Sequence, residues 1–183
     1  MNEAEKYQEV WEHDEYRGYS PGESYVWMFL EMLKEHNIKM KGKLAEIGCG
    51  TGRAGLILNN FFEVHKYDIT SNCLDEFVPK TNFHVLDICK EPLPKHNIGY
   101  CCDVMEHMPT EYVMTVLNNI AKSCNYAFFS ICTKPDHFGK LVGEDLHLTV
   151  KPYTWWRDKL SETGELLEAR DLLNDTIFLA SYN

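Results

Sequence analysis

The sequence predicts an α/β fold: seven strands in one mostly parallel sheet, helices on both faces, and an antiparallel hairpin at the C-terminus. From residue 43 onward, short apolar runs alternate with helical segments, which is the pattern of a doubly wound parallel sheet. The last two strand-like runs are joined by Leu173-Asn174-Asp175. That link is too short for a parallel crossover, so these two strands should be antiparallel. The strands are expected at residues 43–47, 62–67, 83–86, 98–102, 126–132, 165–171 and 176–182.

The helices are predicted from the spacing of apolar residues and the position of turn residues. The longest expected helix places Val113, Val116, Leu117 and Ile120 on one face. All of this indicates one domain, residues 1–183, in which residues 1–42 supply N-terminal helices and a candidate lid, and residues 43–183 form the ligand-binding core. The helices are expected at 2–13, 23–37, 53–60, 71–77, 110–124 and 153–163, with a loop at 16–22.

The composition is that of an ordinary globular protein. The 183 residues are 44% hydrophobic and 25% charged, and the formal net charge is -10. This charge disfavours a broad electrostatic grip on nucleic acid or an anionic membrane, although it leaves room for a local basic groove. The start of the chain is polar and acidic, and no apolar run approaches the ~20 residues of a membrane span. The seven cysteines are odd in number and form no C-x-x-C pair, so a reducing cytoplasm is the expected location.

A glycine-rich segment marks the expected ligand site. Residues 45–52, Ala-Glu-Ile-Gly-Cys-Gly-Thr-Gly, follow a predicted strand and open a predicted helix. Glycines let the backbone turn tightly and approach a ligand, and the helix N-terminus beyond offers unpaired N–H groups. This pattern indicates a nucleotide-type ligand. Residues 50–55 also match G-x-G-x-x-G, the dinucleotide fingerprint, so the loop alone leaves NAD open, as well as a turn that binds nothing.

Three further features argue against NAD. Glu46 lies just before the first glycines, where it would repel a pyrophosphate and attract a cationic group. Acidic residues end three successive strands, at Asp68, Asp87 and Asp103. The C-terminal hairpin is also unlike a simple nicotinamide domain.

These segments together resemble class I S-adenosylmethionine-dependent methyltransferases. Residues 44–52 resemble the first motif of that family, and residues 67–70, 86–88 and 102–108 resemble the second to fourth motifs in the same order. The resemblance covers residue 43 to the C-terminus and implies a Rossmann-like fold, methyl transfer, S-adenosylmethionine as methyl donor and S-adenosylhomocysteine (SAH) as product. One departure is the link at residues 89–97, which is too short for a full crossover helix.

The resemblance also implies which residues bind the cofactor. The glycines would line the methionine and ribose, Glu46 would hold the ammonium group, and Asp68 would accept from both ribose hydroxyls. Asp87 would accept a hydrogen bond from the adenine amino group, and the Ile88 N–H would lie at the adenine ring. Turn or cap functions remain the alternatives for the three aspartates. The full implied set is Glu46, Gly48, Cys49, Gly50, Gly52, Asp68, Ile69, Asp87, Ile88, Cys102 and Asp103.

The segment 16–22 has the composition of a lid, with aromatic residues, one arginine and glycines. The Tyr16 ring would suit the face of a sulfonium, and the Arg17 guanidinium could pair with the methionine carboxylate. We therefore add Tyr16 and Arg17 to the expected cofactor site. A plain surface connector is the alternative.

The methyl acceptor is harder to read from sequence. In-line transfer depends on holding donor and acceptor in a reactive geometry, and a base is needed only when the acceptor loses a proton of high pKa. His107 and His147 are the predicted catalytic residues, although packing or surface positions are common for a histidine; His137, Trp155 and Trp156 are further candidates for the pocket wall. A small-molecule O or N acceptor is the leading hypothesis. The alternatives are an RNA 2′-O-methyltransferase with a divalent metal, and an idle module that only binds the cofactor.

A metal is left uncommitted, and no residue is assigned as a ligand. Asp103, Glu106 and His107, with His147 later in the chain, are similar to the Glu-x-x-Glu-His pattern of small-RNA 2′-O-methyltransferases, whose cluster holds a divalent ion. This chain departs from that pattern in having Asp103 for the first glutamate and a single histidine beside the second. Asp103 is also expected at the cofactor. The alternative is that these side chains only shape a metal-free pocket.

Overall fold

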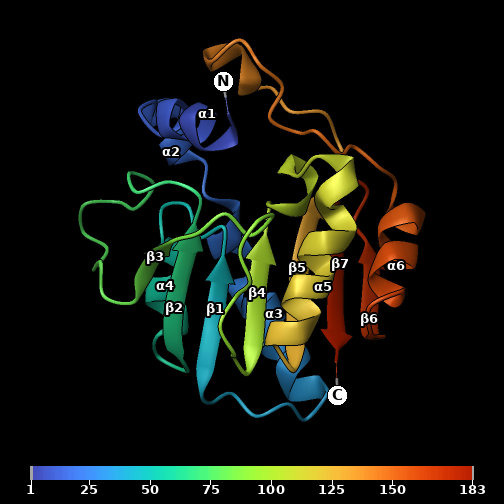
Figure 1. Ribbon diagram of the computed structural model, residues 1–183. Coiled ribbons are helices and arrows are strands. Elements are labelled where there is room, and N and C mark those ends of the chain that lie inside the picture. The colour runs from blue at the N-terminus through green and yellow to red at the C-terminus, as the bar shows by residue number, and fades with distance from the viewer. Residues whose placement is uncertain (1, 183) are drawn as a thin grey trace.

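The computed structural model describes residues 2–182 and contains one seven-stranded sheet with the order β3-β2-β1-β4-β5-β7-β6 (Figure 1). Strands β3, β2, β1, β4 and β5 run parallel, and β7 lies antiparallel between β5 and β6. This confirms the predicted fold class and the C-terminal hairpin. The strands are β1 (Lys43–Ile47), β2 (Glu63–Asp68), β3 (Phe83–Val85), β4 (Ile98–Cys102), β5 (Tyr126–Cys132), β6 (Glu165–Asp171) and β7 (Asp175–Ser181).

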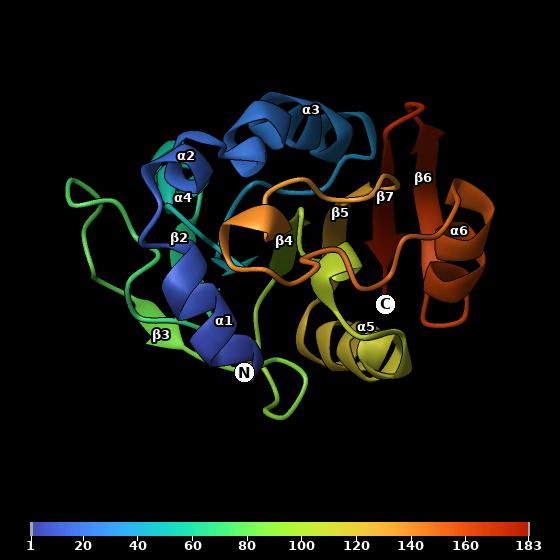
Figure 2. The ribbon, with the colours of Figure 1, turned by 90° about the horizontal axis from the view of Figure 1, so that it is seen from above.

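Helices cover both faces of the sheet, as Figure 2 shows from above. Helices α3 (Pro21–Glu35) and α4 (Arg53–Leu58) pack on one face, and α5 (Val113–Ser123) and α6 (Tyr153–Ser161) pack on the other. Two further helices, α1 (Glu3–Val10) and α2 (Asp14–Gly18), lie beyond the carboxyl ends of the parallel strands (Figure 1). No helix within residues 2–182 is long and apolar enough to cross a membrane.

Burial of apolar side chains explains why the central elements form where they were expected. The four residues of the α5 stripe are all buried and pack against the sheet. Strand β5 is buried on both faces, with Phe129 toward α5 and Phe128 toward α3. Each such side chain contributes roughly 1.5–3 kcal/mol through burial. These two elements therefore anchor the sheet at its centre.

Two expected elements are wrong. Residues 71–77 form bends and turns and contain no helix. Residues 16–22 do not form one loop, because α2 continues to Gly18 and α3 begins at Pro21. Proline is compatible with the first position of a helix, since its fixed φ suits the helix and its missing N–H is not needed there. The link at 89–97 contains no helix, as its length indicated.

The glycine loop turns the chain from β1 into α4 through left-handed conformations. Gly48, Gly50 and Gly52 have φ angles of 63°, 49° and 73°. A Cβ atom at Gly52 would lie 2.7 Å from Cδ2 of Leu74 and 2.9 Å from Cγ1 of Val78. The loop therefore needs glycine both for its backbone angles and for the space beside it.

Two matched substitutions separate these needs. Gly143 has a φ of 71° and no heavy atom within 4 Å of an added Cβ. Gly143→Ala should therefore lose only the conformational strain, about 1–2 kcal/mol. Gly52→Ala should lose more, on the order of 3 kcal/mol, because Leu74 and Val78 must also move. Urea unfolding of both variants measures this, and equal losses would show that the space beside Gly52 is unimportant.

Candidate active site

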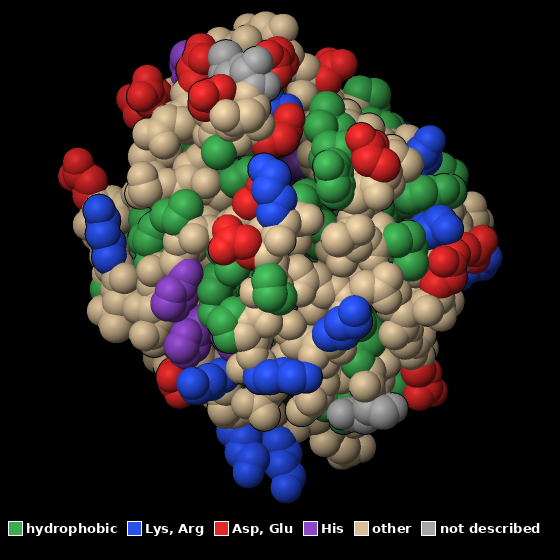
Figure 3. Space-filling view, viewed as in Figure 1, with side chains coloured by type: hydrophobic (Ala, Val, Ile, Leu, Met, Phe, Trp, Pro, Cys, Tyr) green, Lys and Arg blue, Asp and Glu red, His purple; other side chains and the backbone are tan. Residues whose placement is uncertain are grey.

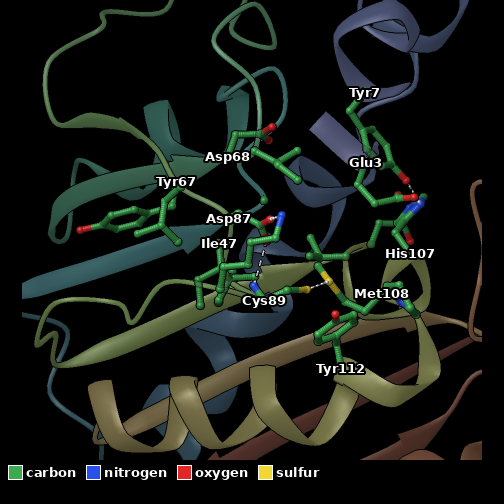
Figure 4. Close-up of a pocket in the computed structure, with 18 of the residues that line it drawn as sticks. Glu3, Tyr7, Ile47, Tyr67, Asp68, Asp87, Cys89, His107, Met108 and Tyr112 are labelled. Carbon is green, nitrogen blue, oxygen red and sulfur yellow. Dashed lines mark hydrogen bonds and ion pairs between the residues drawn. The ribbon is translucent and has the colours of Figure 1, made fainter. Parts of the chain in front are cut away.

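A cavity of about 250 Å³ lies at the carboxyl ends of β1 and β2, beside the segments that follow β3 and β4. The sheet changes winding direction between β1 and β4, and ligands of doubly wound sheets bind at such a point. In Figure 4, Tyr7 and Glu3 of α1 lie on the other side of this cavity from the sheet. A smaller hollow of about 80 Å³ adjoins it, with Trp11, Tyr16, Gly48, Asp103 and His107 in both walls.

Most of the residues expected from the sequence lie in these walls. The larger cavity is lined by Tyr16, Gly48, Asp68, Ile69, Asp87, Ile88, Asp103 and His107. The smaller hollow adds Cys49, Gly50, Cys102 and His147. Three expected residues line neither wall, namely Arg17, Glu46 and Gly52.

Asp68, at the end of β2, ties the glycine loop to the sheet. Its Oδ2 accepts a hydrogen bond from the Gly50 N–H at 2.9 Å. Its Oδ1 accepts from the Thr70 N–H at 3.2 Å and from the Thr70 hydroxyl at 3.3 Å. Burial raises the pKa of this carboxyl, while these hydrogen bonds oppose the rise. A carboxylate has about four acceptor positions, so Asp68 can still accept from a ligand.

Glu46 does not reach the cavity. Its Oε1 accepts from the Gly55 N–H of α4 at 3.1 Å, and its Oε2 is buried without a hydrogen-bond partner. Burial raises the pKa of Glu46 to about 8, although the charge of Lys66 opposes the rise. Glu46 therefore contacts the start of α4 and lines neither hollow, so its contact with a ligand ammonium group stays a prediction.

Asp87 marks the far end of the larger cavity. Its Oδ1 accepts from the Cys89 N–H at 3.0 Å, and its Oδ2 pairs with the Lys90 ammonium at 2.7 Å (Figure 4). Around it the wall is apolar, with side chains suited to a flat ring: Ile47, Leu86, Ile88, Leu93, Val104 and Met108.

Arg17 lies outside both hollows. Its guanidinium donates to the main-chain carbonyls of Trp11, Asn72 and Cys73, and it lies 3.5 Å from the Asp75 carboxylate. The expected pairing with a ligand carboxylate is therefore not supported. Arg17 instead fastens α2 to the segment after β2.

The N-terminal aromatic residues form the rest of the cover. Tyr16 packs edge-on against Trp11 and Phe138, with ring centroids 4.8 Å and 5.4 Å apart. The Trp11 ring lies over Gly50, where an added Cβ would come within 2.9 Å of it. Sequence reasoning missed Trp11 and Tyr7. The available signal was their spacing of four residues, which places both rings on one side of α1 and the residue that caps it.

A cluster of acids and histidines occupies the other end of the cavities. Glu106 is fully buried, and its Oε1 accepts from the Cys132 N–H at 2.8 Å. Burial and the charge of Asp103 raise the pKa of Glu106 well above its usual range. The His107 and His147 rings meet edge to face with centroids 4.7 Å apart. Burial lowers the pKa of His107 to about 3, so this imidazole is neutral.

The remaining candidates from the sequence are not part of the site. His137 is exposed, and Trp156 is fully buried in the core beneath α6 with Trp155 packed beside it. None of the three lines either hollow. The two tryptophans therefore serve packing.

No family model and no curated protein matches this chain. Several solved structures do match this chain in fold. Magnesium protoporphyrin IX methyltransferase from Synechocystis PCC 6803 with bound SAH matches with a TM-score of 0.67 and 17% identity, over 88% of this chain and 83% of the other. A DhpI–SAH complex matches with a TM-score of 0.70 and 12% identity, over 97% and 94%. This is the fold of S-adenosylmethionine-dependent methyltransferases.

A third methyltransferase structure agrees with this assignment. A S-adenosylmethionine-dependent methyltransferase from Clostridium acetobutylicum ATCC 824 has a TM-score of 0.66 and 11% identity, over 86% of this chain and 90% of the other. The methyltransferase fold confirms the resemblance of the four sequence motifs at the level of architecture. With identities this low, the likeness does not extend to the acceptor.

Replacing Glu46 tests its burial in this methyltransferase fold. Its pKa is 4.5 in an unperturbed chain and about 8 here, so the folded state keeps a proton that the unfolded state loses. Stability should therefore fall as the pH rises through that window. Glu46→Gln removes the titrating group and should be more stable than the wild type above about pH 8, by an amount on the order of a few kcal/mol.

Urea unfolding at about pH 5 and about pH 9 measures this difference. Glu31→Gln, on the exposed side of α3, is the matched control and should follow the wild type at both pH values. Identical pH dependence of Glu46→Gln and wild type would show that Glu46 is ionised in the folded protein.

Proposed function

We propose that this protein is a S-adenosylmethionine-dependent methyltransferase that acts on an oxygen or nitrogen of a small molecule. The observation that carries the proposal is the cavity in which the glycine loop and the Asp68 carboxylate share one wall. The methyltransferase fold and the SAH-bound neighbours support the same cofactor.

The two hollows would hold different parts of the cofactor. Asp68 would accept from the ribose hydroxyls, and Asp87 with the Ile88 backbone would receive the adenine among the apolar side chains of the larger cavity. Gly48, Gly50 and Cys102 would line the methionine end in the smaller hollow, beside Asp103. Trp11 and Tyr16 lie in both walls. We propose that the segment of α1 and α2 is the lid that closes over the bound cofactor.

The acidic and histidine cluster would face the methyl acceptor. His107 and His147 line the smaller hollow together with Asp103. A neutral imidazole nitrogen in this place can accept a proton from a hydroxyl or an amine as the methyl group is transferred. Holding the acceptor in line with the sulfonium supplies much of the remaining rate.

The surface charge and the position of α1 beside the cavity favour a small acceptor over a polymer. On the face shown in Figure 3, acidic side chains gather at the end that carries α1, and the basic side chains gather at the opposite end. A phosphate backbone would be repelled at the acidic end, and α1 would leave it little access to the cavity.

The cofactor assignment is tested by calorimetry with S-adenosylmethionine, SAH and NAD. The first two should bind and NAD should not. Asp68→Ala should weaken binding of both cofactor forms at least tenfold, because two hydrogen bonds to a charged acceptor contribute roughly 1.5–3 kcal/mol each. Asp158→Ala, on the exposed side of α6, should bind like the wild type. Tight binding of NAD, or unchanged binding by a folded Asp68→Ala variant, would contradict the assignment.

The acceptor class is tested by transfer of labelled methyl to separate pools of metabolites, RNA and DNA. Label should enter the metabolite pool, and Asp68→Ala should abolish it. Label in RNA would replace the small acceptor with a ribose or base. Cofactor binding without transfer to any pool would identify a module that only binds.

A further inference from the structure

The strongest feature beyond the cofactor site is the place where Glu106, His107 and His147 meet. One donor atom from each of these three side chains lies within 4.8 Å of the other two. Glu106 and His107 come from the single turn η1 (Met105–His107) after β4, and His147 comes from the loop before α6. Segments about 40 residues apart in the chain are thus held against each other.

The two imidazoles have the same proton arrangement. Nδ1 of His107 lies 3.0 Å from the Leu146 carbonyl and 2.6 Å from the Tyr7 hydroxyl, and Nδ1 of His147 lies 2.6 Å from the Lys134 carbonyl. A carbonyl oxygen only accepts, so each carbonyl contact places the proton on Nδ1, and the Tyr7 hydroxyl then accepts from the same N–H of His107. Each Nε2 atom is therefore left with its lone pair, and neither has a hydrogen-bond partner among residues 2–182. Imidazoles that ligate a metal are oriented in this way by their other nitrogen.

An unpartnered carboxylate oxygen gives independent support. Oε1 of Glu106 is satisfied by the Cys132 N–H, but Oε2 is buried and has no hydrogen-bond partner in the described chain. Asp103 lies beside this carboxylate and, with a φ of 56°, has a left-handed backbone conformation. Two neighbouring acids and two open imidazole nitrogens form a site in which a cation would satisfy every group.

The loop that carries His147 is pinned to the turn that carries the other two residues. The Thr149 N–H donates to the Glu106 carbonyl at 2.8 Å, and the Thr149 hydroxyl donates to the Met108 carbonyl at 2.7 Å. The arrangement is therefore held by the Thr149 N–H and hydroxyl and does not depend on a ligand. Bonds of ~2.1 Å to one ion would hold the three donor atoms roughly 3.4 Å apart, so only small side-chain movements are needed.

A second group of cysteine and acid donors does not make a comparable site. The donor atoms of Cys49, Asp68 and Cys73 also lie within 4.8 Å of one another. Both Asp68 oxygens already accept hydrogen bonds from Gly50 and Thr70, and each thiol lies within reach of a backbone carbonyl. No orphaned atom remains there to require an ion.

We propose that Glu106, His107 and His147 bind one divalent transition-metal ion through the Glu106 carboxylate and the two Nε2 atoms. Two imidazoles and one carboxylate favour Zn²⁺, Co²⁺, Mn²⁺ or Fe²⁺ over Mg²⁺ or Ca²⁺, which prefer oxygen ligands. Three protein ligands leave the ion an open position. Both histidines and Asp103 line the smaller hollow, so that position faces the cavity proposed for the acceptor. With both Nε2 atoms on the ion, the histidines would no longer accept the proton of the acceptor, and the ion would instead lower the pKa of a hydroxyl bound at its open position.

The test uses the full chain without an affinity tag, freed of metal by a chelator and titrated with Co²⁺ alone. The visible absorption of bound Co²⁺ should saturate at one ion per chain. His147→Asn and Glu106→Gln should each weaken Co²⁺ binding by more than about tenfold. His137→Asn, in the same exposed region but outside the cluster, should bind Co²⁺ like the wild type.

Two results would overturn the site. The first is no saturable binding, or binding unchanged in a His147→Asn variant whose circular dichroism and melting match the wild type. The second is a sulfur-to-cobalt charge-transfer band, which would place the ion on the cysteines. His147→Asn keeps the test decisive if Glu106→Gln does not fold. Because Co²⁺ binding is measured without cofactor or acceptor, it succeeds or fails independently of methyl transfer.

Discussion

The site depends on one geometric constraint, which is that parallel strands deliver their carboxyl ends to the same edge of the sheet. Asp68 leaves β2 at that edge, and Asp103 leaves β4 there two strands away. Nothing in the chain between them needs to be conserved in length for these carboxylates to converge. The Gly50–Asp68 hydrogen bond then fixes the glycine loop against the same edge. The other walls of the cavity are built around this contact between the glycine loop and the end of β2.

Concentrating acids at one edge costs stability, and the surrounding contacts show how the cost is offset. Asp68 receives three hydrogen bonds, and Glu46 receives one from α4 together with the nearby charge of Lys66. Glu46 and Glu106 each keep one oxygen without a partner, but Glu106 is the less compensated because its charged neighbour is Asp103 and not a lysine. Buried groups that are incompletely paired are expected where a ligand completes the pairing.

Sequence reasoning worked best where local pattern and burial coincide. The predicted bounds of β1, β4 and β5 agree with the structure, because these strands are mostly buried and end at turn residues. It failed at residues 71–77, where Arg17 and Thr51 bond to the main chain and hold it in turns. It also did not foresee the protein contacts of Glu46 and Arg17, whose partners lie on other elements. The residue types indicated that each has a charged or polar partner. Only the packing of α4 against Glu46, and of α2 with Arg17 against the segment after β2, determined which partner each has.

The order of the strands has a consequence for how the chain is assembled. Strand β7 comes last of the seven in sequence yet lies inside the sheet, between β5 and β6. Strand β6 therefore has no sheet neighbour until β7 has been synthesised, and β5 remains an open apolar edge until then. The N-terminal helix faces a similar delay, because Tyr7 bonds to His107 and Lys6 to the Asp145 carbonyl. The α1 segment is thus made well before its partners, and the apolar edge of β5 stays exposed to aggregation until β7 has been made.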